Sequence, residues 1–334
     1  MVAEFDYRLP GKARSQRPGG HQSNMSGGGM IFRRHVSLFA SPDPRRLDIR
    51  ASLRDPAEQW WVREYQQRAA IPVVVVLDVS TSMGFRGMQN RARAAANFVE
   101  SAAWSANRRG DRFGLIGFDR RLREDCWLPV RQQRAALEGV IQHLRHDGAR
   151  DPGYEGLAEV PAWLPREPGL VFLVSDFHWP VEMLRRFLEN SRPHHVVPVV
   201  LWDRAEYSGW PTRGFAFAED MESGERRLIW LRRGWNEDVE SAYAERESAI
   251  RDTCEAFDLR PLFLRDGFSA ESVAPVFSRI FSTRVALEAR AVVFTPSAPA
   301  IASNWSLSFA SRADFSRASA AMVPAFTDPF CGRV

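Results

Sequence analysis

Lysine is almost absent from this sequence. Lys12 is the only lysine among 45 basic residues, and the formal net charge is only +4. The arginines are interspersed with acidic residues, as at Glu225–Arg227, so no basic stripe predicts a nucleic-acid partner. Cysteine is also scarce, and its three positions are too far apart for a disulfide framework or a zinc-ligand spacing in the sequence. They are Cys126, Cys254 and Cys331.

Long apolar runs and two common enzyme motifs are missing as well. No run approaches the length of a membrane span, and the first residues, MVAEFDYRLPGKAR, contain no apolar signal core. We therefore expect a soluble cytoplasmic protein without a membrane span. The sequence contains no Walker motif, so ATP hydrolysis is not predicted. It also contains no Gly-x-Ser-x-Gly elbow, so a serine hydrolase is not predicted. With 334 residues, 45% of them hydrophobic, the chain can form one large domain or two modest ones.

The most informative stretch is IPVVVVLDVSTSM, which begins at Ile71. Its first seven residues are apolar and rich in valine, which predicts a strand buried on both faces. Asp78, Ser80 and Ser82 follow at alternating positions, and an alanine-rich helix is predicted over 88–106. In open α/β sheets, ligands bind at this end of the strands. One carboxylate and two hydroxyls are hard oxygen ligands that suit Mg²⁺, although the serines could instead cap the helix.

The pattern Asp-x-Ser-x-Ser resembles the metal-ion-dependent adhesion site of von Willebrand factor A domains. The resemblance implies that an aspartate at the end of a second buried strand, GLVFLVSD, completes the site, and Asp176 holds that position. It also implies a threonine ligand from a later loop, but no threonine lies between Thr81 and Thr212. Two alternatives are open: Asp151 replaces the hydroxyl, or the Arg150 guanidinium pairs with Asp78 in place of the cation.

The order of the predicted elements indicates a doubly wound, Rossmann-like α/β sheet. Apolar strands near Ile71, Phe113, Leu170 and Val196 alternate with helical patterns. A helix is predicted over 131–146, where two histidines stand three residues apart. This pair is either a metal site or, because no carboxylate is near in sequence, part of a solvated helix end. The histidines are His143 and His146.

Composition divides the chain into four parts. Residues 1–30 are predicted to form a flexible arm, and residues 31–70 an N-terminal β extension in which Trp60 and Trp61 cover a sheet edge. The von Willebrand A-like domain is expected over 71–283, with a β-hairpin inserted at about 213–232. The alanine-, serine- and phenylalanine-rich tail, 284–334, is expected to be poorly ordered.

A second motif narrows the resemblance. The stretch ahead of the Asp-x-Ser-x-Ser strand contains Asp43, Arg45, Arg46 and Asp48. It is similar to a motif of a bacterial von Willebrand A-like family known as a domain of unknown function. The chain lacks the tryptophan that most members carry there. Members of this family are commonly encoded beside MoxR-type AAA+ ATPases, which are thought to act in metalloenzyme assembly or cofactor insertion.

The resemblance implies a non-enzymatic adaptor. It would act with a MoxR-type ATPase and bind a client metalloenzyme, for instance methanol dehydrogenase, or other von Willebrand A-like proteins. The adhesion-like site, with or without Mg²⁺, would bind an acidic partner side chain. Two other hypotheses stay open: a metal-free structural or regulatory module, and a metal-dependent hydrolase, for which one or two carboxylates are a weak water-activating set.

Overall fold

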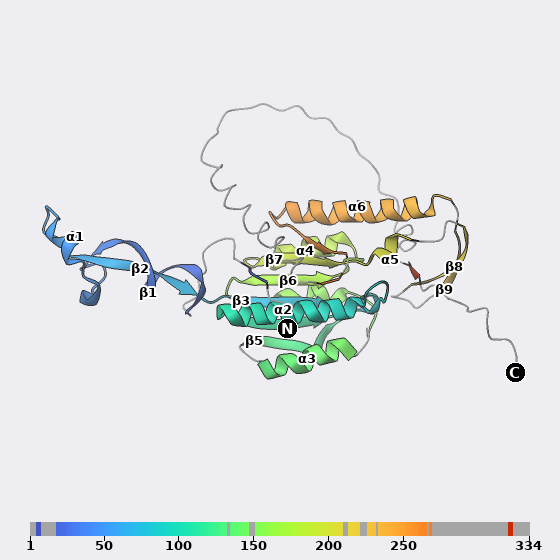
Figure 1. Cartoon of the computed structure of the whole chain (residues 1–334), viewed down its shortest axis with the longest axis horizontal. Helices are drawn as coiled ribbons and strands as arrows, with labels where there is room; N and C mark the ends of the chain where they lie inside the picture. The colour runs from blue at the N-terminus through green and yellow to red at the C-terminus, as the bar shows by residue number, and fades with distance from the viewer. Residues whose placement is uncertain are drawn as a thin grey trace, which may run out of the picture.

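The structure is a computed structural model of the whole chain, and its central feature is one six-stranded sheet (Figure 1). It describes residues 5–7, 18–131, 134–146, 151–209, 213–220, 226–231, 233–265, 267–268 and 320–322.

The strand order of the large sheet is β10-β7-β6-β3-β4-β5. All neighbours are parallel except the edge strand β5, which is antiparallel to β4. The valine-rich strand β3 lies in the middle, and every residue of it is buried. This order is that of a doubly wound α/β sheet, so the predicted doubly wound fold is confirmed. The strands are β3 (Pro72–Asp78), β4 (Arg112–Phe118), β5 (Leu122–Arg131), β6 (Leu170–Ser175), β7 (His195–Leu201) and β10 (Leu262–Leu264).

Helices cover both faces of this sheet. The sheet has a hydrophobic core on each face, and alternate residues of β3 point into one core or the other. Val75 packs in the core that contains α2 and α3, and Val76 packs in the core that contains α4 and α6. No helix among the described residues is long and apolar enough to cross a membrane. The helices are α2 (Arg91–Arg109), α3 (Arg134–His146), α4 (Val181–Asn190), α5 (Arg204–Tyr207) and α6 (Trp235–Glu255), with 3-10 turns η2 (Thr81–Gly84), η3 (Glu155–Ala158) and η4 (Val160–Trp163).

An N-terminal β extension projects from one end of the domain (Figure 1). Strands β1 (Pro18–Ser37) and β2 (Trp61–Ala69) form an antiparallel pair that is separate from the large sheet. The predicted β extension over 31–70 is partly helical, and one further prediction for it is wrong. The helix α1 (Ile49–Leu53) follows η1 (Pro44–Arg46), because the Asp48 side chain caps its first turn. Trp61 belongs to β2, so it covers no edge of the large sheet.

The first 30 residues differ from the flexible arm that their composition predicts. Residues 18–30 belong to β1, and the two aromatic rings before it are buried in the domain core. Phe5 stacks on Phe98 of α2, and the Tyr7 hydroxyl donates to Asp111 Oδ2 at 2.7 Å. His21 contacts the same oxygen at 2.8 Å. Isolated aromatics without a period give no pattern in the sequence, yet each finds a partner more than 85 residues away.

The predicted hairpin insertion is confirmed. Strands β8 (Gly214–Asp220) and β9 (Arg226–Leu231) are antiparallel, and β11 (Ala320–Met322) pairs with the free edge of β8. The turn of the hairpin lies outside the described residues. So does the rest of the tail, 284–334, apart from β11.

Candidate functional site

The candidate site lies at the carboxyl end of the two central strands. Asp78 is the last residue of β3, and Asp176 immediately follows the neighbouring parallel strand β6. Both side chains are buried, with residue exposures of 1% and 0%. The sheet therefore brings together two carboxylates that are 98 residues apart in sequence, at the edge where ligands bind in this fold.

The two predicted serines follow Asp78 at the turn η2, where Ser80 is the N-cap residue and Ser82 lies in the turn. Asp78 Oδ1 accepts a hydrogen bond from the Ser80 backbone N–H at 2.9 Å, and the Ser175 hydroxyl donates to Oδ2 at 2.7 Å. The Ser80 and Ser82 hydroxyl oxygens are 3.1 Å apart and hydrogen bonded. Asp78, Ser80 and Ser82 thus form one cluster of oxygen atoms, which we call the hydroxyl cluster.

A buried arginine joins this cluster to the second aspartate. Arg91 is the first residue of α2 and is only 5% exposed. Its Nη1 donates to Asp176 Oδ2 at 2.8 Å and to the Ser82 carbonyl oxygen at 2.9 Å, and its Nη2 forms an ion pair with Glu206. Asp176 is therefore neutralised by a side chain of this protein. A buried carboxylate needs such a partner, because transfer from water costs several kcal/mol if its charge is unpaired.

Glu206 connects the arginine to a further buried network. Its Oε2 accepts a hydrogen bond from the Tyr243 hydroxyl at 2.9 Å and lies 3.2 Å from His178 Nε2. Its Oε1 accepts from the Asp203 backbone N–H, which completes a capping box at the start of α5. The network connects the ends of β6 and β7 with α2 and α6.

Electrostatics make the two aspartates unequal. Burial and the negative charge of Asp176 raise the pKa of Asp78 above its usual value. Burial also acts on Asp176, but the Arg91 guanidinium, the Ser82 hydroxyl and the His178 backbone N–H outweigh it and lower the pKa of that carboxyl. Burial lowers the pKa of His178 to about 4, so its imidazole is neutral at pH 7. Asp78 is thus the carboxylate that a positive partner would stabilise most.

The turn after β6 has a strained backbone. Phe177 has φ = 56°, in the left-handed region that a large residue seldom adopts. Arg246 of α6 holds the turn, because its guanidinium donates to the carbonyl oxygens of Phe177 and Trp179. Strain of this kind persists only where the surroundings enforce it, and it is concentrated at functional sites.

The fifth predicted ligand lies apart from the other four. Asp151 is exposed, and no hydrogen bond or ion pair links it to the hydroxyl cluster or Asp176 in the described part of the chain. Arg150, the alternative cation, lies outside the described residues. The guanidinium that the structure does place in the crevice is Arg91, and its partner is Asp176 rather than Asp78.

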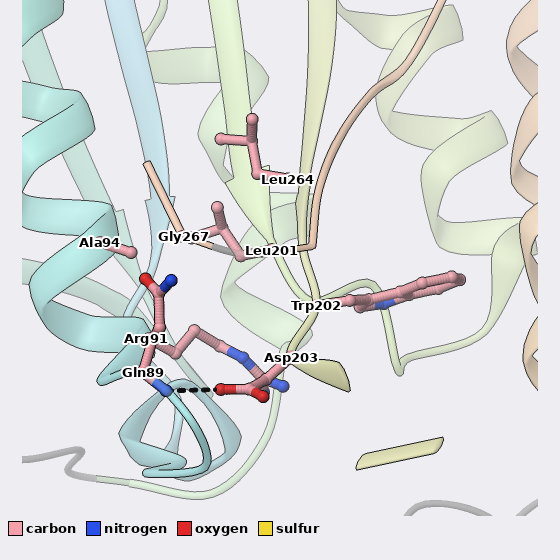
Figure 2. A pocket seen from close by; sticks show the side chains of 8 residues that line it. All are labelled: Gln89, Arg91, Ala94, Leu201, Trp202, Asp203, Leu264 and Gly267. Atoms are coloured by element: carbon pink, nitrogen blue, oxygen red, sulfur yellow. Dashed lines mark hydrogen bonds between the residues drawn. The ribbon is translucent and has the colours of Figure 1, made fainter. Parts of the chain in front are cut away.

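A small pocket adjoins this crevice. Gln89 and Arg91 approach it from the start of α2, and Trp202 and Asp203 from the end of β7 (Figure 2). The Gln89 backbone N–H donates to Asp203 Oδ2 at 2.8 Å, which closes one side. The remaining lining residues are Ala94, Leu201, Leu264 and Gly267.

The sequence reasoning missed the charged partners of the site. Arg91 follows Asn90, which caps α2 by accepting from the Arg93 backbone N–H, so its position at a helix start was detectable. The spacing of Asp203 and Glu206 is a recognisable capping-box signal. That these residues meet Asp176 could not be predicted, because it depends on how α2 and α5 approach the sheet edge.

Comparisons with solved structures return proteins of low sequence identity. The conserved hypothetical protein BatB from Bacteroides thetaiotaomicron is 13% identical with a TM-score of 0.37, and the match covers 65% of this chain and 100% of that one. A von Willebrand factor type A protein from Catenulispora acidiphila is 12% identical with a TM-score of 0.37, over 66% of this chain and 43% of that one.

Sequence comparison is more direct. A Paracoccus denitrificans protein described as "Uncharacterized protein in moxR 3'region" is 31% identical over 99 residues, which are 30% of this chain and 94% of that protein. The model of the family described as "Protein of unknown function DUF58" matches residues 42–251, which contain the hydroxyl cluster, Arg91, Asp176 and Glu206. The chain therefore belongs to the DUF58 family.

Proposed function

We propose that this protein is a non-enzymatic accessory protein that acts with a MoxR-type AAA+ ATPase. In this proposal the pair assembles a metalloenzyme or inserts its metal or cofactor, with methanol dehydrogenase as one candidate client. The partner assignment is supported by the related Paracoccus protein, whose description places it in the moxR 3' region. The observation that carries the adaptor role is the hydroxyl cluster beside Asp176 at the carboxyl end of β3 and β6.

The donor atoms of the hydroxyl cluster fit Mg²⁺. Neighbouring ligands of an octahedral Mg²⁺ with bonds of about 2.1 Å lie roughly 3 Å apart, and the Ser80 and Ser82 hydroxyl oxygens are 3.1 Å apart. The buried Thr81 hydroxyl between them in sequence has no hydrogen-bond partner among the described residues. Asp78, Ser80 and Ser82 would hold the ion, with water in other positions. A bound Mg²⁺ would supply an open coordination position for a carboxylate of the partner.

Charge supports the same assignment. Asp78, Asp176 and Glu206 carry up to three negative charges, and Arg91 compensates only one of them by direct ion pairs. Burial, together with the charge of Asp176, raises the pKa of Asp78, so its carboxylate form is disfavoured while no cation is beside it. A divalent cation would relieve this repulsion.

The surroundings of the serines favour binding over catalysis. Activation of a serine hydroxyl needs a general base within hydrogen-bond reach. His178, two residues after Asp176, is one candidate for such a base. Its Nε2 lies 3.2 Å from Glu206 Oε2, so it is directed at that carboxylate instead of a serine hydroxyl. Asp78 accepts two hydrogen bonds already, and Asp176 is paired with Arg91.

The Arg91–Asp176 pair also supports a second candidate, a metal-free adaptor. In that version the guanidinium is the resident cation of the crevice, and the partner binds without Mg²⁺. The two versions differ in their metal dependence and not in their partner.

A pull-down with the MoxR-type ATPase of the same organism tests the proposal. Wild type is compared with Asp78→Ala and with Asp151→Ala as a matched aspartate control, each in Mg²⁺ and in EDTA. Capture that needs Mg²⁺ and Asp78 but not Asp151 supports the adhesion-like site. Capture in EDTA that also survives Asp78→Ala assigns the contact to another surface. No capture under any condition refutes the ATPase partnership, and thermal unfolding of each variant checks that it folds.

A further inference from the structure

A second cluster of metal-ligating side chains lies on the opposite edge of the sheet from β10, where β5 bulges. Ile116 of β4 pairs with Trp127, but the next residue, Gly117, pairs with Arg123. Residues 124–126 therefore have no partner in β4. Adjacent strand residues normally point to opposite faces, and a bulge is a device that redirects a side chain.

Gly117 makes the bulge possible. A Cβ atom at this position would lie 2.4 Å from Cys126 Cβ, well inside van der Waals contact. With glycine there, Cys126 fits against β4 and is completely buried. The strand therefore needs a residue without a side chain opposite the cysteine.

The bulge brings three different ligand types together. Asp125 and Cys126 come from β5, and His143 comes from α3, which packs on that strand. Their ligand atoms all lie within 4.8 Å of one another. His143 Nε2 is 2.9 Å from Asp125 Oδ2. The Asp125 and His143 side chains are 38% and 33% exposed, so the cluster is open to solvent on one side and closed by the thiol on the other.

We propose that Asp125, Cys126 and His143 form a binding site for a transition-metal ion of the Zn²⁺ class. Thiolate, imidazole and carboxylate are the three protein ligands of zinc, and a thiolate selects against Mg²⁺ and Ca²⁺. Three protein ligands leave the fourth tetrahedral position to water, on the exposed side of the cluster. On binding, the Cys126 thiol releases its proton to solvent, and the thiolate and the Asp125 carboxylate together balance the two charges of the ion.

Arg123 occupies part of this site without metal. Its Nε and Nη2 donate to the two Asp125 oxygens at 2.9 and 2.8 Å. Its Nη1 also donates to Asp119 Oδ2 at 2.8 Å, and Asp119 is buried. The guanidinium can therefore release Asp125 to a metal ion and keep its second partner. It is a competitor for the carboxylate, and its removal should strengthen metal binding.

Titration of the full-length, reduced and EDTA-treated protein with Co²⁺ tests the site. We expect one equivalent to give the near-ultraviolet charge-transfer band of a thiolate–Co²⁺ bond, and Zn²⁺ to abolish the band. Cys126→Ser should lose it, and His143→Gln should bind at least about tenfold more weakly. Cys254→Ser, Cys331→Ser and Asp78→Ala should each keep it, which separates this site from the other thiols and from the hydroxyl cluster.

Arg123→Gln distinguishes ligation from a structural role. Removal of this competitor for Asp125 should tighten Co²⁺ binding by up to about fivefold, whereas a merely structural cluster gains no affinity from it. Because the change also removes the partner of the buried Asp119, thermal unfolding checks that the variant folds. A wild-type protein without the charge-transfer band, or a band that survives both Cys126→Ser and His143→Gln, would overturn the proposal. If Cys126→Ser fails to fold, the half-exposed His143→Gln and Arg123→Gln variants still decide. Neither result depends on the ATPase pull-down.

Discussion

Replacing Arg91 with methionine removes the positive charge that compensates two buried carboxylates. The side chain is 5% exposed, and its partners Asp176 and Glu206 are 0% and 6% exposed. Methionine keeps much of the apolar stem but provides no hydrogen-bond donor to Asp176 Oδ2 or the Ser82 carbonyl. Both carboxylates would remain in the interior without an ion-pair partner from α2.

Removal of one partner from a buried pair costs about 3–5 kcal/mol, because the other charge stays desolvated. A loss of that size corresponds to a decrease in Tm on the order of 10 °C for a domain of this size. The pH dependence has a definite sign. Without Arg91, burial raises the folded-state pKa of Asp176 above its unfolded value, so the folded state binds protons more readily. The destabilisation should therefore be full near pH 7.5 and shrink as the pH falls toward 5.

Urea unfolding at pH 7.5 and pH 5.5, without divalent metal, measures both effects. Arg145→Met is the matched control, because Arg145 is 35% exposed and pairs with Glu100 on the surface. The control should lose less than about 1 kcal/mol and show little pH dependence. If Arg91→Met were no more destabilising than Arg145→Met, the buried pair would not hold the site together. The reasoning about the charge network would then be wrong.

Two further predictions concern the β5 bulge and the N-terminal β extension. Gly117→Ala places a Cβ atom against Cys126 and should lower the free energy of unfolding by about 1–3 kcal/mol. Gly139→Ala, with open space on α3, should raise it by roughly 0.5–1 kcal/mol. Equal midpoints of the two variants in urea unfolding would contradict the packing at Gly117. Hydrogen bonds from Arg63 hold the pKa of Asp48 well below its usual range, so its contribution to stability is present above about pH 4 and lost as the pH falls through the folded-state pKa. The protection factors of the β2 amides against hydrogen exchange, taken relative to the intrinsic rate at each pH, should fall in acid for wild type but not for Asp48→Asn, and parallel profiles would exclude this role.

The sequence predicts the sheet and one half of the candidate site. A short apolar run rich in β-branched valine is typical of a strand buried on both faces. In a parallel sheet, the polar residues that follow such a strand lie at the carboxyl edge. Asp78, Ser80 and Ser82 are close in the chain, so local geometry alone brings them together. Asp176 was found by analogy, through its place after a second buried strand.

The remaining contacts of the candidate site and the core depend on residues that are far apart in the sequence and that the tertiary structure brings together. Arg91 meets Asp176 because α2 begins beside the carboxyl end of β6, and no local pattern encodes that contact. The composition around Phe5 and Tyr7 predicts a flexible arm, since two isolated rings have no period, but both side chains are buried among distant residues.

The Asp125–Cys126–His143 cluster shows the same division. In the sequence, the scattered cysteines excluded a zinc spacing, and His143 had no carboxylate near it. The bulge at Gly117 and the packing of α3 on β5 supply the carboxylate of Asp125 and the thiol of Cys126 from 18 and 17 residues away. Amino-acid patterns predict which strands are buried, because the burial of a strand follows its local composition. A set of metal ligands instead forms from side chains that are distant in sequence, and only tertiary packing brings them together.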